Sequence, residues 1–191
     1  MLFRSTVERP TKRVAFWRVG RGAIEGAGSR DSSLVTWSFE DPQNRKRRTV
    51  VADVNGDGLT DVTCTNTLSN AVMTYRQENG KGLGAPLANP SFADLDSLAV
   101  APSKDGAIVF TLSEKEGVVG RSSWKDGALG FPVAMPLSAG AVPSVLSLVR
   151  LESGPRVAVV TKDGRNYQLE LLPVDGVKSE GGKAEGGKAE G

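Results

Sequence analysis

The sequence predicts an all-β fold. Short runs such as V-T-C-T from Val62 and A-V-M-T-Y from Ala71 are rich in β-branched and aromatic residues and alternate as half-buried strands do. The 191 residues include 23 glycines and 10 prolines, which suit many tight turns, and 39% hydrophobic residues, which suit a packed core. Long apolar stripes with a helical period are not evident, so helices are not expected.

The most distinctive segment is D-V-N-G-D-G-L-T-D, residues 53–61. It offers an oxygen donor at every second position, as a hard cation requires of one short loop. The predicted metal ligands are the side chains of Asp53, Asn55, Asp57 and Asp61 and the backbone carbonyl of Leu59. Gly56 and Gly58 let the backbone turn tightly between them. Three carboxylates, an amide and a carbonyl favour Ca²⁺ over zinc, which prefers nitrogen or sulfur.

The residues after this loop indicate a strand rather than a helix. The same donor spacing opens an EF-hand, but the twelfth position counted from Asp53 is Cys64, where an EF-hand places a bidentate Glu. The strand-like run from Val62 follows directly. The alternative to a calcium loop is a metal-free turn, since Asp/Asn/Gly-rich turns are common connectors.

Two short segments indicate an internal repeat. L-G-A-P-L-A from Leu83 recurs as L-G-F-P-V-A from Leu129, 46 residues later. Apolar strands precede these segments at Ala71 and Ala107, and a third candidate strand begins at Asn166. Units of roughly 40 to 50 residues with several short strands each are typical of β-propeller blades.

Together these residues resemble FG-GAP, or VCBS-type, repeats, the calcium-loop propeller repeats found in integrin-α-like proteins. Residues 53–61 match the D-x-[DN]-x-D-G-x-x-D loop, and the segments at Leu83 and Leu129 match the F-G-x-P-like trailing segment. The resemblance covers about residues 50–172. It weakens before Leu98, where Asp94 and Asp96 remain without a glycine-containing loop, so we interpret them as a degenerate loop rather than an acid/base pair.

The resemblance implies about three blades and one metal site. A closed ring needs at least about four blades, so we expect an open arc, completed by further blades of a longer chain or by another chain. Its terminal faces should then expose apolar surface. Trp17, Trp37 and Trp124 are interpreted as residues that seal contacts between neighbouring sheets, with ligand stacking as the alternative.

Both ends of the sequence are assigned outside the repeats at residues 14–173. Met1 to Ser5 resembles the translated end of a sequencing adapter, so residues 1–13 are assigned as a leader, artefactual if that resemblance holds. No signal-peptide pattern is visible there. Residues 174–191 contain G-G-K-A-E twice in tandem, and their small and charged side chains predict a disordered tail.

Composition argues against several functions. The sequence has no histidine, which removes Ser-His-Asp and Cys-His catalysis, and its single Cys64 is expected to be a buried, inert thiol. A net charge of +2 favours neither nucleic acid nor an anionic membrane, and no apolar run reaches the ~18 residues of a membrane helix. The basic run at residues 45–48 predicts a solvated loop, with an anion-binding patch as the alternative.

The expected function is therefore non-catalytic. The resemblance implies a calcium-binding propeller module of an extracellular, periplasmic or cell-surface protein that recognises a protein or carbohydrate ligand through its loops. The alternative is an accessory propeller of a larger extracellular polysaccharide-active enzyme, because such repeats resemble modules joined to hydrolases and lyases. A dockerin-like module is a third hypothesis, but it needs a second loop and helices, which the sequence lacks.

Overall fold

The computed structural model describes the backbone of residues 2–8, 13–19, 34–38, 46–79, 81–104 and 106–175. Every regular element in these residues is a β-strand, and all strand pairs are antiparallel, so the all-β prediction is confirmed. The described residues contain no helix long and apolar enough to cross a membrane.

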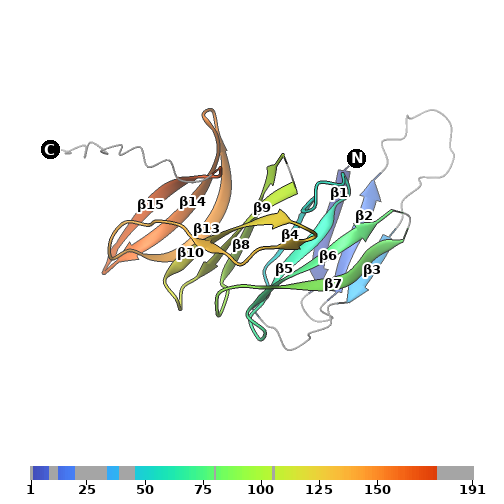
Figure 1. The fold of residues 1–191 in the computed structure, drawn as a ribbon, viewed down its shortest axis with the longest axis horizontal. Helices are drawn as coiled ribbons and strands as arrows, with labels where there is room; N and C mark the ends of the chain where they lie inside the picture. Colours follow the sequence, from blue (N-terminus) through green and yellow to red (C-terminus); the bar gives the residue numbers. More distant parts are fainter. Residues whose placement is uncertain are drawn as a thin grey trace.

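Four sheets follow one another along the chain (Figure 1). The first sheet holds β1 (Leu2–Glu8), β2 (Arg13–Val19) and β3 (Leu34–Ser38). The second holds β4 (Thr49–Ala52), β5 (Asp61–Asn66), β6 (Ala71–Glu78) and β7 (Gly82–Pro90). The third holds β8 (Ser97–Ser103), β9 (Gly106–Ser113), β10 (Val118–Lys125), β11 (Ala128–Leu129) and β12 (Val133–Ala134). The fourth holds β13 (Val142–Leu151), β14 (Gly154–Asp163) and β15 (Asn166–Pro173).

Each sheet is an up-and-down meander in which consecutive strands pair. In the third sheet, β11 and β12 both pair with β10, because the chain leaves that strand and returns to it. The β10–β11 hairpin turns on Asp126 and Gly127, whose φ angles are 53° and 84°. An Asp-Gly pair suits such a two-residue hairpin turn, since both central residues need positive φ.

The meanders of the second, third and fourth sheets repeat with a regular spacing. Their first strands begin at residues 49, 97 and 142, their second at 61, 106 and 154, and their third at 71, 118 and 166. Corresponding strands of the second to fourth sheets therefore start 45 to 48 residues apart. The Leu83 and Leu129 segments occupy matching places, on β7 and at β11–β12. The strand at Ala107 is a second strand, however, so the counterpart of Ala71 is Val118.

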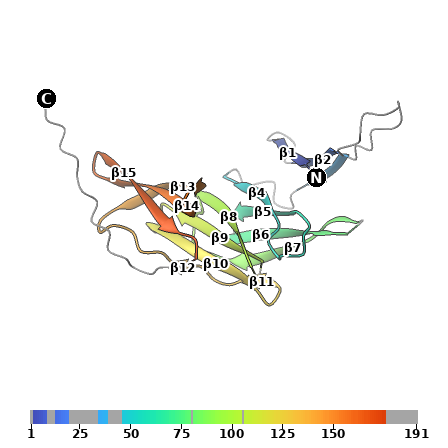
Figure 2. The same cartoon turned by 90° about the horizontal axis from the view of Figure 1, so that it is seen from above.

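The third sheet packs against the second and the fourth sheets through apolar side chains (Figure 2). The central strand β9 shows this best, because all eight of its residues are buried. Its Ala107 and Val109 join the cluster that also contains Val54 and Val72 of the second sheet. The alternate residues of β9 join a cluster with the fourth sheet that includes Ile108, Phe110, Leu112, Leu146, Val157 and Val159. The period of two along a strand thus supplies two separate cores.

A third cluster covers the other face of the second sheet, with Val62, Cys64, Tyr75 and Leu83. Trp124 is buried in the cluster between the second and third sheets, which confirms its predicted sealing role. The other two tryptophans lie in β2 and β3, and their side chains are outside the described part of the structure.

The ends of the described chain differ in detail from the expected boundaries. Residues 2–8 of the assigned leader form β1, paired with β2. Val174, the first residue of the assigned tail, is 3% exposed and belongs to the core beside the fourth sheet. Residues 176–191, where the disordered tail is predicted, lie outside the described residues.

Candidate metal centre

The candidate loop, residues 53–61, connects β4 to β5 at one end of the second sheet. Its second residue, Val54, is fully buried among apolar residues of the second and third sheets. The carbonyl oxygen of Val54 accepts a hydrogen bond of 2.9 Å from the backbone N–H of Ala107. The loop is therefore anchored to the neighbouring sheet by one side chain and one backbone contact.

The first half of the loop folds around the carboxylate of Asp53. Asp53 Oδ1 accepts a hydrogen bond from Gly56 N at 2.7 Å, and Oδ2 accepts one from Gly58 N at 2.9 Å. The two glycines have φ angles of 80° and 81°, in the left-handed region that costs glycine little. The sequence positions of these glycines are thus explained by the turn itself.

Asn55 and Asp57 lie together at the exposed tip. Asn55 Nδ2 donates a hydrogen bond to Asp57 Oδ2 at 2.8 Å, and Asn55 Oδ1 accepts one from Asp57 N at 3.2 Å. The other oxygen of Asp57, Oδ1, accepts a hydrogen bond from Leu59 N at 2.7 Å. Both side chains are accessible from solvent, so a cation can reach them without opening the core.

Asp61 is fully buried at the base of the loop, as the first residue of β5. Its Oδ2 accepts a hydrogen bond from Val54 N at 2.9 Å, and its Oδ1 accepts one from Gln77 N at 2.8 Å. Burial raises the pKa of Asp61 above its ordinary value, although the hydrogen bonds from Gln77 and Val54 oppose the shift. The negative charges of Asp57 and Asp53 raise this pKa further.

The donor chemistry of the loop fits a hard cation, but the donors are not drawn together. Within the described residues, no group of three or more His, Cys, Asp or Glu side chains is close enough to hold a metal ion. The loop oxygens instead accept backbone N–H groups, which leaves each carboxylate with further acceptor capacity. The five predicted ligands would hold a cation only if their oxygens converged more closely.

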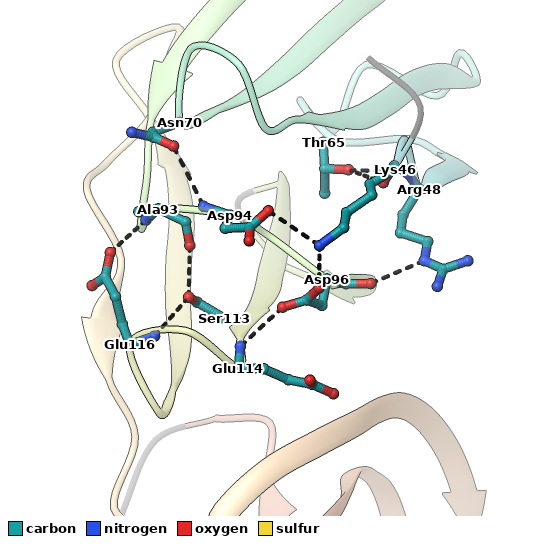
Figure 3. Close-up of polar contacts among 10 residues, drawn as sticks. All are labelled: Lys46, Arg48, Thr65, Asn70, Ala93, Asp94, Asp96, Ser113, Glu114 and Glu116. Carbon is teal, nitrogen blue, oxygen red and sulfur yellow. Dashed lines mark hydrogen bonds and ion pairs between the residues drawn. The ribbon is translucent and has the colours of Figure 1, made fainter.

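The second acidic pair, Asp94 and Asp96, forms ion pairs with Lys46 (Figure 3). Lys46 Nζ lies 3.5 Å from Asp94 Oδ1 and 3.7 Å from Asp96 Oδ1. Asp96 also accepts a hydrogen bond from Glu114 N at 3.0 Å, and its backbone carbonyl accepts one from Arg48 Nε at 2.9 Å. This pair precedes the first strand of the third sheet, so it is not the counterpart of residues 53–61, which follow a first strand.

The basic run thus makes contacts within the chain. Lys46 and Arg48 hold the segment before β8, and Arg47 forms a hydrogen bond with the buried Cys64. Arg45 lies outside the described residues. Burial raises the pKa of the Cys64 thiol to about 12, with Arg47 opposing the shift, which agrees with the inert thiol predicted from the sequence.

Sequence reasoning missed the residues that hold the loop in place, namely Val54, Gln77 and Ala107. Gln77 and Ala107 donate through their backbone N–H groups. Nearly every residue has such a group, so the side chains at these positions gave no signal. Val54 had one available signal, because it is a branched apolar residue between two acidic ligand positions.

Comparisons with known proteins identify no family. No protein-family model matches the chain, and no significant match is found among the curated proteins or the solved structures. The resemblance to FG-GAP repeats therefore depends on the residues quoted above.

Proposed function

We propose that this chain is a non-catalytic, calcium-binding β-propeller repeat module of a secreted or cell-surface protein. The spacing supports this proposal, because meanders that start 45 to 48 residues apart are of the size expected for propeller blades. Their face-to-face packing also agrees with it, since each blade of a propeller buries its faces against its neighbours.

The observation that carries the calcium proposal is the electrostatic state of Asp61. Burial is the main cause that raises the pKa of this carboxylate, and the nearby negative charges of Asp57 and Asp53 raise it further. A divalent cation would relieve that repulsion and stabilise all three ionised groups at once. Oxygen donors alone favour calcium over a transition metal. Its ligands would be Asp53, Asn55, Asp57, Leu59 and Asp61.

Recognition through surface loops follows from this architecture. In a stack of rigid sheets the connections between strands are free to vary, and binding residues commonly lie on such loops. A protein or carbohydrate ligand is the proposed class of partner. A catalytic role is not part of the proposal, because the sequence has no histidine and its only thiol is buried with a raised pKa.

Calcium titration by calorimetry tests the metal site. The wild-type chain is expected to release or absorb heat at one site, and Asp57→Ala is expected to lose it. Asp163→Ala is the matched control, because this exposed acidic residue closes β14 far from the loop and should leave binding unchanged. With a dissociation constant near 10⁻⁴ M, about 1 mM calcium should raise the unfolding free energy by roughly 1.5 kcal/mol.

Two results would contradict the proposed calcium site. If the wild type shows no heat and no calcium-dependent rise in unfolding temperature, the loop is a metal-free turn. The same conclusion follows if Asp57→Ala binds calcium as tightly as the wild type.

A further inference from the structure

Asn55 and Gly56 form an Asn-Gly pair at the tip of the loop at residues 53–61, where water can reach them. The side-chain carbon Cγ of Asn55 and the backbone nitrogen of Gly56 are so close in the covalent chain that a bond between them closes a five-membered imide ring. Gly56 has no Cβ atom to hinder that approach. The pair therefore brings an electrophile and a nucleophile together within one short turn.

The nitrogen of Gly56 has a carboxylate beside it. Its N–H group donates a hydrogen bond to Asp53 Oδ1 at 2.7 Å. This distance lies within the range of about 2.6–3.2 Å over which a side chain can remove a proton as a general base. The N–H bond lies in the peptide plane, and the lone pair that attacks a carbonyl carbon is perpendicular to that plane. Asp53 can therefore keep its contact with the proton while the nitrogen attacks Asn55.

The side-chain amide of Asn55 is held at both of its polar atoms by Asp57. The backbone N–H of Asp57 donates to Asn55 Oδ1 at 3.2 Å, and Asn55 Nδ2 donates to Asp57 Oδ2 at 2.8 Å. The first contact stabilises the negative charge that develops on Oδ1 when Cγ becomes tetrahedral. The second contact restricts rotation of the amide, which lowers the entropic cost of closing the ring.

The fold of the loop keeps the base and the amide in place. Asp53 Oδ2 accepts a second hydrogen bond, from Gly58 N at 2.9 Å, so the carboxylate is fixed through both of its oxygens. Val54, which lies between Asp53 and Asn55 in the sequence, is fully buried among apolar residues of two sheets. The two reacting side chains therefore flank a residue that is anchored in the core.

We propose that Asn55 is a self-modification site at which the nitrogen of Gly56 attacks Cγ of Asn55. The N–Cγ bond forms while the proton of Gly56 passes to Asp53 Oδ1, and the N–H of Asp57 stabilises the oxyanion. The Cγ–Nδ2 bond then breaks, and the amide group takes that proton and leaves as ammonia. Water opens the imide at one of its two carbonyl carbons and leaves aspartate or isoaspartate at position 55. Water is the only co-reactant.

The aspartate product adds a negative charge to the tip of the loop. The 2.8 Å hydrogen bond between Asn55 Nδ2 and Asp57 Oδ2 would become a contact between two carboxylates, which repel each other. In a loop that holds calcium as proposed above, the same step would replace a neutral ligand with a charged one. Only this last consequence rests on the proposed function, because the reaction itself involves no metal.

The sequence supplies an internal comparison, since Asn79 and Gly80 form a second Asn-Gly pair. Asn79 is exposed in the turn that follows β6, outside the loop. The chain is incubated in calcium-free buffer with a chelator, and peptide mass spectrometry measures conversion of each amide to the acid. In the native chain Asn55 should convert at least about tenfold faster than Asn79, since a positioned general base contributes about 10²–10⁴-fold. In urea the two rates should become similar.

Asp53→Asn tests the base, because the amide keeps an oxygen acceptor but cannot take the proton. Conversion at Asn55 should slow at least about tenfold. Asp163→Asn is the matched control, since this exposed residue at the end of β14 is far from the loop in sequence and should leave the rate unchanged. Far-UV circular dichroism confirms that both variants fold.

The pH profile separates a base from a merely structural role. A carboxylate base is already ionised between about pH 6 and 8, so the native rate at Asn55 should change little over that range. The rate at Asn79 should rise about tenfold per pH unit, as a hydroxide-dependent reaction does.

Native conversion at Asn55 that is no faster than at Asn79, or no faster than in urea, overturns the proposal. An Asp53→Asn variant that converts like the wild type also overturns it, as does a native rate at Asn55 that rises with pH as steeply as the rate at Asn79. Each of these results leaves the calcium proposal standing, because calcium binding is measured separately by calorimetry.

Discussion

The side-chain oxygen of Asn89 accepts a hydrogen bond of 2.9 Å from the backbone N–H of Leu129. The same side chain donates through Nδ2 to the carbonyl oxygen of Val72 at 2.9 Å and to Thr74 Oγ1 at 3.3 Å. Asn89 is buried on β7, and Leu129 is on β11, so one amide joins the second sheet to the third. A polar group this deep is stabilising only while its partners are in place.

Replacing Asn89 by Ala should therefore destabilise the protein strongly. The change leaves the buried N–H of Leu129 without its acceptor, and an unsatisfied buried group costs about 1–3 kcal/mol. Urea unfolding followed by tryptophan fluorescence measures the loss. Asn166→Ala, at an exposed position on β15, is the control and should change stability by less than about 0.5 kcal/mol. Equal stabilities for the two variants would contradict the role of this amide.

Gly120 on β10 is required for close packing rather than for a turn. A Cβ atom at this position would lie 2.6 Å from Pro132 Cβ and would also collide with the ring of Phe92. That ring packs against the core between the second and third sheets and makes an edge contact with Phe131, with 5.6 Å between the ring centroids, so moving it would disturb both contacts. Gly120→Ala should cost about 1–3 kcal/mol through overpacking.

Gly130→Ala is the matched control for this change. A Cβ atom at Gly130 would meet nothing within 4 Å, so the substitution should be nearly neutral. Both unfolding free energies come from chemical denaturation. If the two substitutions have the same effect, the contact between β10 and the ring of Phe92 is looser than the structure shows.

Asp61→Asn separates the structural role of this carboxylate from its proposed metal role. In calcium-free buffer the variant should lose about 1.5–3 kcal/mol, since an amide can accept from only one of the two N–H groups of Val54 and Gln77. Asp57→Asn should be nearly neutral in the same buffer, because its side chain is exposed. Thermal unfolding with a chelator present measures both, and a neutral Asp61→Asn would contradict the buried hydrogen bonds.

Cys64 should be unreactive in the folded protein. Burial raises its thiol pKa from 9.0 to about 12, so the native thiolate fraction near pH 8 is about 1,000-fold lower than that of an ordinary thiol. Alkylation should therefore proceed only after unfolding, as mass spectrometry with and without denaturant will show. Rapid labelling of the native chain would contradict this environment.

The same shift sets a pH dependence. Because the folded state holds this proton more tightly than the unfolded state, the stabilising contribution is complete below pH 9.0 and is lost as the pH rises towards about 12. Other groups titrate in that range as well. The Cys64 contribution is therefore the difference between the wild type and Cys64→Ala, which should shrink across this window in unfolding measurements.

The sequence predicted the fold class because strand signals are local. Runs such as the one from Val62 carry their β-branched residues and turns within a few positions. The alignment of repeats was less reliable, since β6 and β9 are both apolar and β9 is buried on both faces. A strand of that kind lacks the polar alternation that would have identified its place in the sheet.

The environment of the loop could not be predicted for a different reason. Asp61 receives hydrogen bonds from backbone groups, one of which is 16 residues away in sequence. Lys46 reaches Asp94 across 48 residues. The first contact depends on the register between two strands of one sheet and the second on how two sheets stack, and the local sequence pattern specifies neither.

The double burial of β9 has a consequence for how the protein opens. Since its side chains belong to two separate cores, loosening the fourth sheet leaves one core intact, and loosening the second sheet leaves the other. Unfolding should then begin at the outermost layers and move inwards, as in arrays coupled only between nearest neighbours. The amide protons of β9 would be the last to exchange with deuterated solvent.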